Sequence, residues 1–106
     1  MHHFGKAEQG VKGWWAGPWN LGIPVAVGYA TTGIDEPHTH AQMYEVYLVA
    51  QGRSVARVGE QRVSLEAGSV LIVEPGEVHT FIESSPDYYH FVIHAPVVAG
   101  DKYLVE

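Results

Sequence analysis

Glycine and proline interrupt this sequence every few residues and leave only short stretches between them. The 106 residues include 12 glycines and 6 prolines, and no stretch carries the i, i+3, i+4, i+7 apolar pattern of an amphipathic helix. The stretches are instead rich in Val, Ile, Tyr and Phe, which favour strands. Strands this short and closely spaced indicate a small all-β sandwich or barrel. The predicted strands are 25–31, 44–50, 53–58, 61–65, 70–74, 79–82 and 88–94.

The chain divides into an arm and a single barrel. Glycines break up residues 1–22, so we expect an irregular N-terminal arm there, whereas residues 23–106 contain no repeat or linker and form one domain. Three indoles in such an arm must pack on something. We expect the arm to be a lid over the barrel or a subunit contact, and the alternative is an aromatic wall of a ligand pocket. The three are Trp14, Trp15 and Trp19.

Composition limits the partners that this chain can have. The formal net charge of -6 argues against nucleic acid or an anionic membrane as a partner. The absence of cysteine excludes disulfides, thiolate metal sites and cysteine nucleophiles. No apolar run approaches the roughly 20 residues that cross a bilayer, and the first residues show no signal-peptide pattern. We therefore expect a cytoplasmic protein.

The placement of the histidines is the strongest functional signal. His38 and His40 are two residues apart, so in an extended chain both imidazoles point to the same side. Glu45 opens the next predicted strand and can supply a third group, and His79, at the start of another strand, can complete the set. Three imidazoles and a carboxylate suit Fe, Mn, Ni, Cu, Co or Zn and leave positions open for water or substrate.

The spacing around these residues resembles the first motif of the cupin superfamily. That motif has Gly, five residues, His-x-His, three or four residues, Glu, six residues and Gly. The chain follows it except for a gap before His38 that is one residue short. The matching positions are Gly33, His38, His40, Glu45 and Gly52.

The second cupin motif is matched more loosely. It has Gly, five residues, Pro-x-Gly, two residues, His, three residues and Asn. Here the gap after Gly68 is one residue longer, Pro75 and Gly76 are adjacent, and Glu83 replaces Asn. With His79, the resemblance covers residues 25 to about 96. It implies a double-stranded β-helix, or jelly-roll barrel, in which a tight turn at Pro75 and Gly76 directs the strand that carries His79.

The resemblance also implies that His38, His40, Glu45 and His79 bind one divalent transition metal per chain. Strand alternation then places Tyr47 beside Glu45 on the interior face, and Phe81 beside His79. Four side chains are candidates for lining the cavity: Tyr47, Phe81, Phe91 and Gln42.

The last long strand has two faces, one with aromatic and aliphatic residues and one with two histidines. We expect Phe91 and its apolar neighbours to face the interior, so that His90 and His94 point outward. Glu83, beside a turn, is expected to be solvated. No separate catalytic acid or base stands out among the cavity candidates.

The metal site does not by itself define a reaction, because one fold hosts many functions. The resemblance favours a small metal-dependent enzyme, dioxygenase-, isomerase- or decarboxylase-like, that acts on a small organic molecule. An oxidoreductase of the dioxygenase type is the leading enzyme class. The alternative is a non-catalytic module that binds or senses a sugar or an organic acid. Because both faces of strand 44–50 carry apolar residues, we also expect a homodimer with the Trp-rich arm at or near the interface.

Overall fold

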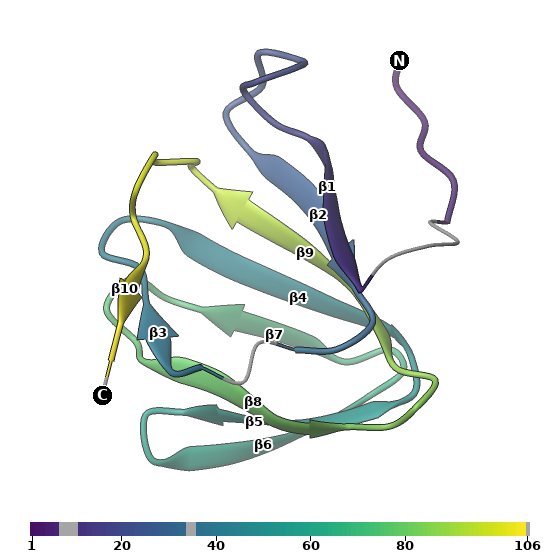
Figure 1. Cartoon of the computed structure of the whole chain (residues 1–106), viewed down its shortest axis with the longest axis vertical. Coiled ribbons are helices and arrows are strands. Elements are labelled where there is room, and N and C mark those ends of the chain that lie inside the picture. Colours follow the sequence, from purple (N-terminus) through teal and green to yellow (C-terminus); the bar gives the residue numbers. More distant parts are fainter. Residues whose placement is uncertain (7–10, 34–35, 106) are drawn as a thin grey trace.

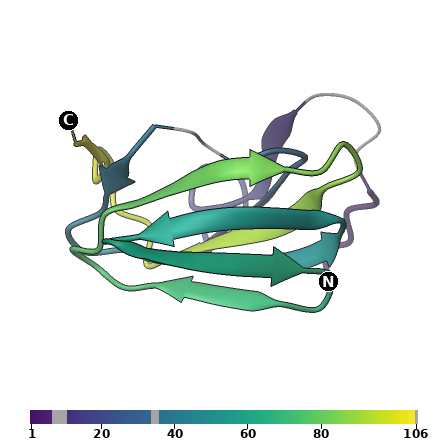
Figure 2. The same cartoon turned by 90° about the horizontal axis from the view of Figure 1, so that it is seen from below.

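The computed structural model describes residues 1–6, 11–33 and 36–105, and within these it contains strands and no helix. The strands form two five-stranded antiparallel sheets, which are the two sides of one barrel (Figures 1 and 2). Sheet A has the order β1 (Lys12–Ala16), β2 (Ala26–Ala30), β9 (Tyr89–Ala95), β4 (Tyr44–Gln51) and β7 (Val70–Val73). Sheet B has the order β10 (Tyr103–Leu104), β3 (His38–Thr39), β8 (His79–Ser84), β5 (Arg53–Val58) and β6 (Gln61–Glu66). No described segment is a helix that could cross a membrane.

All seven predicted strands are present, with ends that shift by up to two residues. A two-residue hairpin at Gly59 and Glu60 joins β5 to β6, with Val58 paired to Gln61. Gly59 has a φ of 60° and Gly76, in the turn before β8, has a φ of 87°. These positive φ values are conformations that glycine adopts without steric cost, and they explain why glycine stands at both turns.

Alternation along the strands separates a packed core from a polar end. The interior face of β4 carries Glu45, Tyr47 and Val49, all nearly inaccessible to solvent. Tyr47 and Val49 belong to the apolar core, whereas Glu45 lies beyond it, towards the end of the barrel where β8 begins. The buried members of the core are Tyr47, Val49, Ala56, Leu65, Val73, Phe81, Tyr88 and Val92.

The Trp-rich arm is more regular than predicted. Lys12–Ala16 is a strand, β1, that pairs with β2 and extends sheet A. On the outer face of the sheet, Trp15 lies against Tyr29 and Phe91, with ring centroids 4.8 and 5.9 Å away. The prediction of an irregular arm is therefore wrong for these five residues, because pairing with β2 and ring packing hold them extended.

Candidate metal centre

The two sheets bring the four predicted ligands to one point. His38 in β3 pairs directly with His79 in β8, so their rings stand side by side with centroids 4.1 Å apart. Glu45 approaches from β4 in the other sheet, and His40 follows β3. One ligand atom from each of the four residues lies within 4.8 Å of all the others, and all four side chains are buried. These four residues, which we call the His3Glu cluster, can hold a metal ion.

The carboxylate of Glu45 is the centre of this cluster. Its Oε1 atom lies 2.7 Å from Nε2 of His79, 3.1 Å from Nε2 of His40 and 3.9 Å from Nε2 of His38. All three imidazoles therefore present the same ring nitrogen to the same oxygen. The cluster therefore offers a metal ion three nitrogen ligand atoms, all of them Nε2, and one carboxylate oxygen.

Backbone carbonyls fix the opposite nitrogen of each imidazole. Nδ1 of His38 lies 2.9 Å from the carbonyl oxygen of Glu36, and Nδ1 of His79 lies 3.2 Å from that of Glu77. Nδ1 of His40 lies 2.6 Å from the carbonyl oxygen of Asp101. A carbonyl oxygen only accepts hydrogen bonds, so each Nδ1 must carry the proton and donate it. In the neutral ring, each Nε2 then presents a lone pair to the centre.

This tautomer pattern is the one that a metal site needs. Three lone pairs and an ionised carboxylate within 4.8 Å repel one another unless positive charge lies between them. A metal ion supplies that charge, and protons on the rings supply it otherwise. Histidine ligands of metals almost always donate their second ring N–H to a carbonyl or carboxylate, as all three do here. The residues present therefore fit a divalent transition metal.

The charge states of the cluster residues also favour the binding of a metal ion. Burial lowers the pKa of His38 to about 4, which keeps this ring neutral and its Nε2 lone pair available near neutral pH. In the metal-free chain, where the rings of His40 and His79 carry a proton on Nε2 as well, burial would raise the pKa of Glu45, but hydrogen bonds from His40, His79 and His94 hold that pKa well below its ordinary value. The hydrogen bond with Glu45 raises the pKa of His40, in spite of the burial of its ring. Glu45 is thus an anion that attracts cations.

A fourth imidazole, which the sequence reasoning placed outside the barrel, also reaches Glu45. Nε2 of His94 lies 2.6 Å from Oε2, the second carboxylate oxygen. The cause is register: β9 pairs with β4 so that His94 stands opposite Glu45, and residues opposite each other share a face of a sheet. The prediction that His90 and His94 point outward is therefore wrong, and His90 is buried as well.

The same register moves Phe91 away from the site. Its ring lies on the outer face of sheet A against Trp15, so it does not line the interior. Tyr47 lies in the wall beside the cluster and Phe81 packs against it, with ring centroids 5.0 Å apart. Gln42 is exposed, and its backbone N–H donates to Asp101. Of the four candidates, only Tyr47 both lines the cavity and lies near the cluster.

A family model described as the cupin domain matches residues 26–102 of the chain. The chain is a cupin. Solved structures agree with this fold. One is an uncharacterized conserved protein with a double-stranded β-helix domain from Klebsiella pneumoniae, which is 29% identical with a TM-score of 0.63. That match covers 77% of this cupin and 73% of the Klebsiella chain. A cupin-like protein from Thermotoga maritima is 19% identical, with a TM-score of 0.74 and coverage of 89% and 74%. Comparison with curated proteins gave no match.

Two further structures that share the fold carry functional names. KdgF from a Halomonas species is 16% identical, with a TM-score of 0.69, and the match covers 92% of this cupin and 89% of KdgF. Pac13, described as a unique nucleoside dehydratase, is 17% identical, with a TM-score of 0.70 and coverage of 96% and 92%. At these identities the likeness shows the double-stranded β-helix that the sequence predicts.

Asp101 supports the cluster of this cupin from a distance in the sequence. Its carboxylate accepts hydrogen bonds from the backbone N–H groups of Ala41, Gln42 and Met43, between 2.8 and 3.0 Å. Its carbonyl oxygen holds the ring of His40. The loop between His40 and Glu45 is therefore tied to the C-terminal segment. Sequence reasoning had no signal for this residue, because it lies 61 positions from His40.

A cavity of about 400 Å³ opens beside the cluster of this cupin. His38 and His40 line it from the side of β3, and Glu45, Tyr47, His90 and His94 line it from β4 and β9. β1 and β2 continue the sheet that carries Glu45 and His94, and they add Trp14 to the lining, with its ring centroid 4.6 Å from that of His94. A cavity of this size accepts a small organic molecule.

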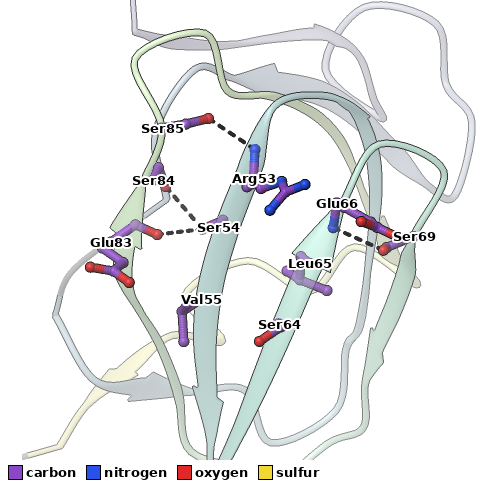
Figure 3. Close-up of a pocket in the computed structure, with 10 residues that line it drawn as sticks. All are labelled: Arg53, Ser54, Val55, Ser64, Leu65, Glu66, Ser69, Glu83, Ser84 and Ser85. Carbon is purple, nitrogen blue, oxygen red and sulfur yellow. Dashed lines mark hydrogen bonds between the residues drawn. The ribbon is translucent and has the colours of Figure 1, made fainter.

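A larger cavity, of about 670 Å³, lies at the opposite end of the barrel (Figure 3). It adjoins the end of β8 that pairs with Ser54, whereas His79 is at the start of that strand. Four of its five serines are hydrogen-bonded to neighbours: Ser54 donates to the carbonyl oxygen of Glu83 and Ser84 lies 2.9 Å from the Ser54 hydroxyl, while Ser69 and Ser85 accept from the N–H groups of Glu66 and Arg53 (Figure 3). We therefore place the functional site at the His3Glu cluster.

Proposed function

We propose that this cupin is a metal-dependent enzyme that acts on a small organic molecule in the cavity beside the His3Glu cluster. In this proposal His38, His40, Glu45 and His79 hold one divalent transition metal per chain. The observation that carries it is the common tautomer: three imidazoles, each with Nδ1 tied to a carbonyl, aim Nε2 at one carboxylate oxygen.

The chemistry available at such a centre is limited and specific. A bound divalent metal supplies Lewis acidity towards oxygen atoms of the substrate. The chain's own residues orient the centre: His94 holds the second oxygen of Glu45, which leaves Oε1 to face the other three imidazoles. Trp14 covers the cavity from the side of β1 and limits the access of water.

Dioxygenase-, isomerase- and decarboxylase-type reactions all suit this arrangement, and an oxidoreductase of the dioxygenase type leads them in our proposal. The sequence shows no separate catalytic acid or base among the cavity candidates, which favours a non-catalytic binding module. The placement of His94 against Glu45, with Tyr47 in the cavity wall, supplies such groups and favours the enzyme.

The test is elemental analysis of protein purified without chelator or nickel resin, followed by an assay of turnover with small organic acids. We expect about one equivalent of a first-row transition metal per chain, with release of protons when metal is added to metal-free protein. Protein that takes up none of the six metals Fe, Mn, Ni, Cu, Co and Zn would contradict the proposal. Tight ligand binding without turnover across the screen would favour the binding module instead.

We also propose that this cupin is a homodimer that buries the outer face of sheet A. Cross-strand neighbours on that face form two apolar rows. One runs through Ile72, Val46, Ile93 and Val27, and the other through Val70, Leu48, Phe91 and Tyr29. In the single chain Val70 and Ile72 are 56% and 57% exposed. Contiguous apolar surface of this kind marks an interaction site, and Trp15 of the arm lies at its border, against Phe91.

We expect a dimer in sedimentation at micromolar concentration and a monomer for Ile72→Lys, because the lysine would place a charge in the apolar interface. Ile82→Lys is the matched control, since Ile82 is also exposed but lies on β8 in sheet B. A wild-type monomer, or dissociation by Ile82→Lys alone, would show that this face is not the interface.

A further inference from the structure

We propose that the cavity beside the His3Glu cluster selects small organic acids with two anionic groups, and that Lys12 and Lys102 bind the group farther from the cluster. The inference rests on the proposed function, because the nearer group is a ligand of the metal. Two distant parts of the chain carry these lysines: Lys12 begins β1, and Lys102 precedes β10. Both line the cavity that contains the cluster.

The sign of the charge in the cavity is opposite to that of the protein. The whole chain has 12 acidic residues and only 6 lysines and arginines, and two of these 6 line this one cavity. Among the described residues that line it, Glu45 is the only acidic one, and both of its oxygens are already bonded to imidazoles. With a divalent cation in the cluster, the cavity is positive, so it attracts anions and repels cations.

The lysines stand at the mouth, and the cluster lies deeper. Lys12 and Lys102 are exposed, whereas the cluster side chains are almost fully buried. Lys102 lines the same cavity as His38, His40 and Glu45 of the cluster. A ligand that spans the cavity therefore meets positive charge at both ends.

The walls between these two ends are mainly apolar. Trp14, Ala30 and Val92 line this part, with Tyr29 beside them. Glycine makes the approach of Trp14 possible, because a Cβ on Gly28 would lie 2.4 Å from the carbonyl oxygen of Gly13 and 2.7 Å from the Trp14 ring. These walls suit a hydrocarbon or aromatic body.

The same walls argue against a neutral sugar. A sugar carries hydroxyl groups around its whole ring and needs donors and acceptors on every side, because unpaired buried hydroxyls are costly. Away from the cluster and the lysines, the uncharged polar side chains that line the cavity are those of Thr32 and Tyr47, because the ring of Tyr29 packs on the outer face against Trp15. An anion at each end with an apolar middle matches the lining far better.

The test compares two ligands of the same shape with different charge. Calorimetry on the metal-loaded full chain would measure the binding of 2-hydroxyglutarate and of its 5-amide, in which the distal carboxylate is neutral. We expect the dianion to bind about tenfold or more tightly at low salt, because charge-assisted hydrogen bonds to the lysines are lost with the amide. We expect Lys12→Gln and Lys102→Gln each to reduce this preference, and the double variant to abolish it.

Lys6→Gln is the matched control. It removes one positive charge from the outer face, where Nζ of Lys6 lies 5.4 Å from the ring centroid of Tyr89. This variant should keep the full preference for the dianion. Equal binding of the acid and its amide, or an equal loss in Lys6→Gln, would overturn the inference. Metal content is measured on the same samples, so that failure of the metal site is distinguished from failure of the lysine site.

Discussion

Replacement of His79 by alanine is expected to reduce metal affinity by more than about a hundredfold, because even residues that only support a metal ligand cost 10- to 100-fold when they are removed. The ring of His79 makes the shortest nitrogen contact with Oε1 of Glu45, at 2.7 Å. Its loss removes one of four donors. We expect His40→Ala to have a similar effect, since that ring lies 3.1 Å from the same oxygen. Metal per chain, measured after dialysis against a weak chelator, should fall from about one to near zero.

Two further variants separate loss of the ligand from loss of the fold. His79→Gln keeps a hydrogen-bond donor near Glu45 but replaces the imidazole, so it should also lose metal while it retains more of the stability. His90→Asn changes a histidine that is equally buried and outside the cluster, and it should keep its metal. Full metal content in both His79 variants would show that these four residues are not the site.

Much of this centre could be predicted because the residues that set the direction of each ligand side chain are close to that ligand in the sequence. The His-x-His pair, the strand that begins near Glu45 and the Gly76 turn before His79 each set their own side chain by alternation or by turn geometry. The structure brings these side chains to one point. Alternation along β4 likewise placed Tyr47 on the face of Glu45, and Tyr47 lines the cavity.

The position of His94 in the site depends on pairing between strands that are distant in the sequence, and no local pattern specifies that pairing. In β9 one face carries Tyr89, Phe91 and Ile93 and the other carries His90 and His94, so a choice based on apolar character alone turns the wrong face inward. Packing on the outer face of sheet A decides which side of β9 points inward, because Trp15 packs on Phe91 and Tyr29 stacks on Tyr89 there. His94 therefore turns inward, where its register partner Glu45 accepts a hydrogen bond from it.

Acidification is expected to destabilise the metal-free protein through a histidine outside the cluster. His90 is 2% exposed, and burial lowers its pKa to about 4. In the unfolded chain the pKa is about 6.5, so between these values the unfolded state binds more protons than the folded state. Stability from this residue is complete above about pH 6.5 and is lost as the pH falls towards 4, by about 3 kcal/mol in total.

The surroundings of His90 explain the size of this effect. The rings of Tyr47 in β4, Phe81 in β8 and Tyr88 pack around it, with centroids between 4.9 and 5.5 Å from its own. Its Nδ1 lies 2.7 Å from the Tyr88 hydroxyl. The negative charge of Glu45 favours the protonated ring, but burial outweighs it. An imidazolium at this position would be a buried cation with neutral aromatic neighbours.

Urea unfolding of chelator-treated protein between pH 7.5 and 4.5 would measure this contribution. His90→Asn is the informative variant, because its amide can keep the bond to the Tyr88 hydroxyl but cannot titrate. The raised pKa of His40 works in the opposite direction, since its share of the stability is lost as the pH rises, and both proteins contain it. The difference between the two stability curves therefore isolates His90. We expect wild type to lose about 2–3 kcal/mol more than the variant over this range, and parallel curves would show that His90 is not held neutral by burial.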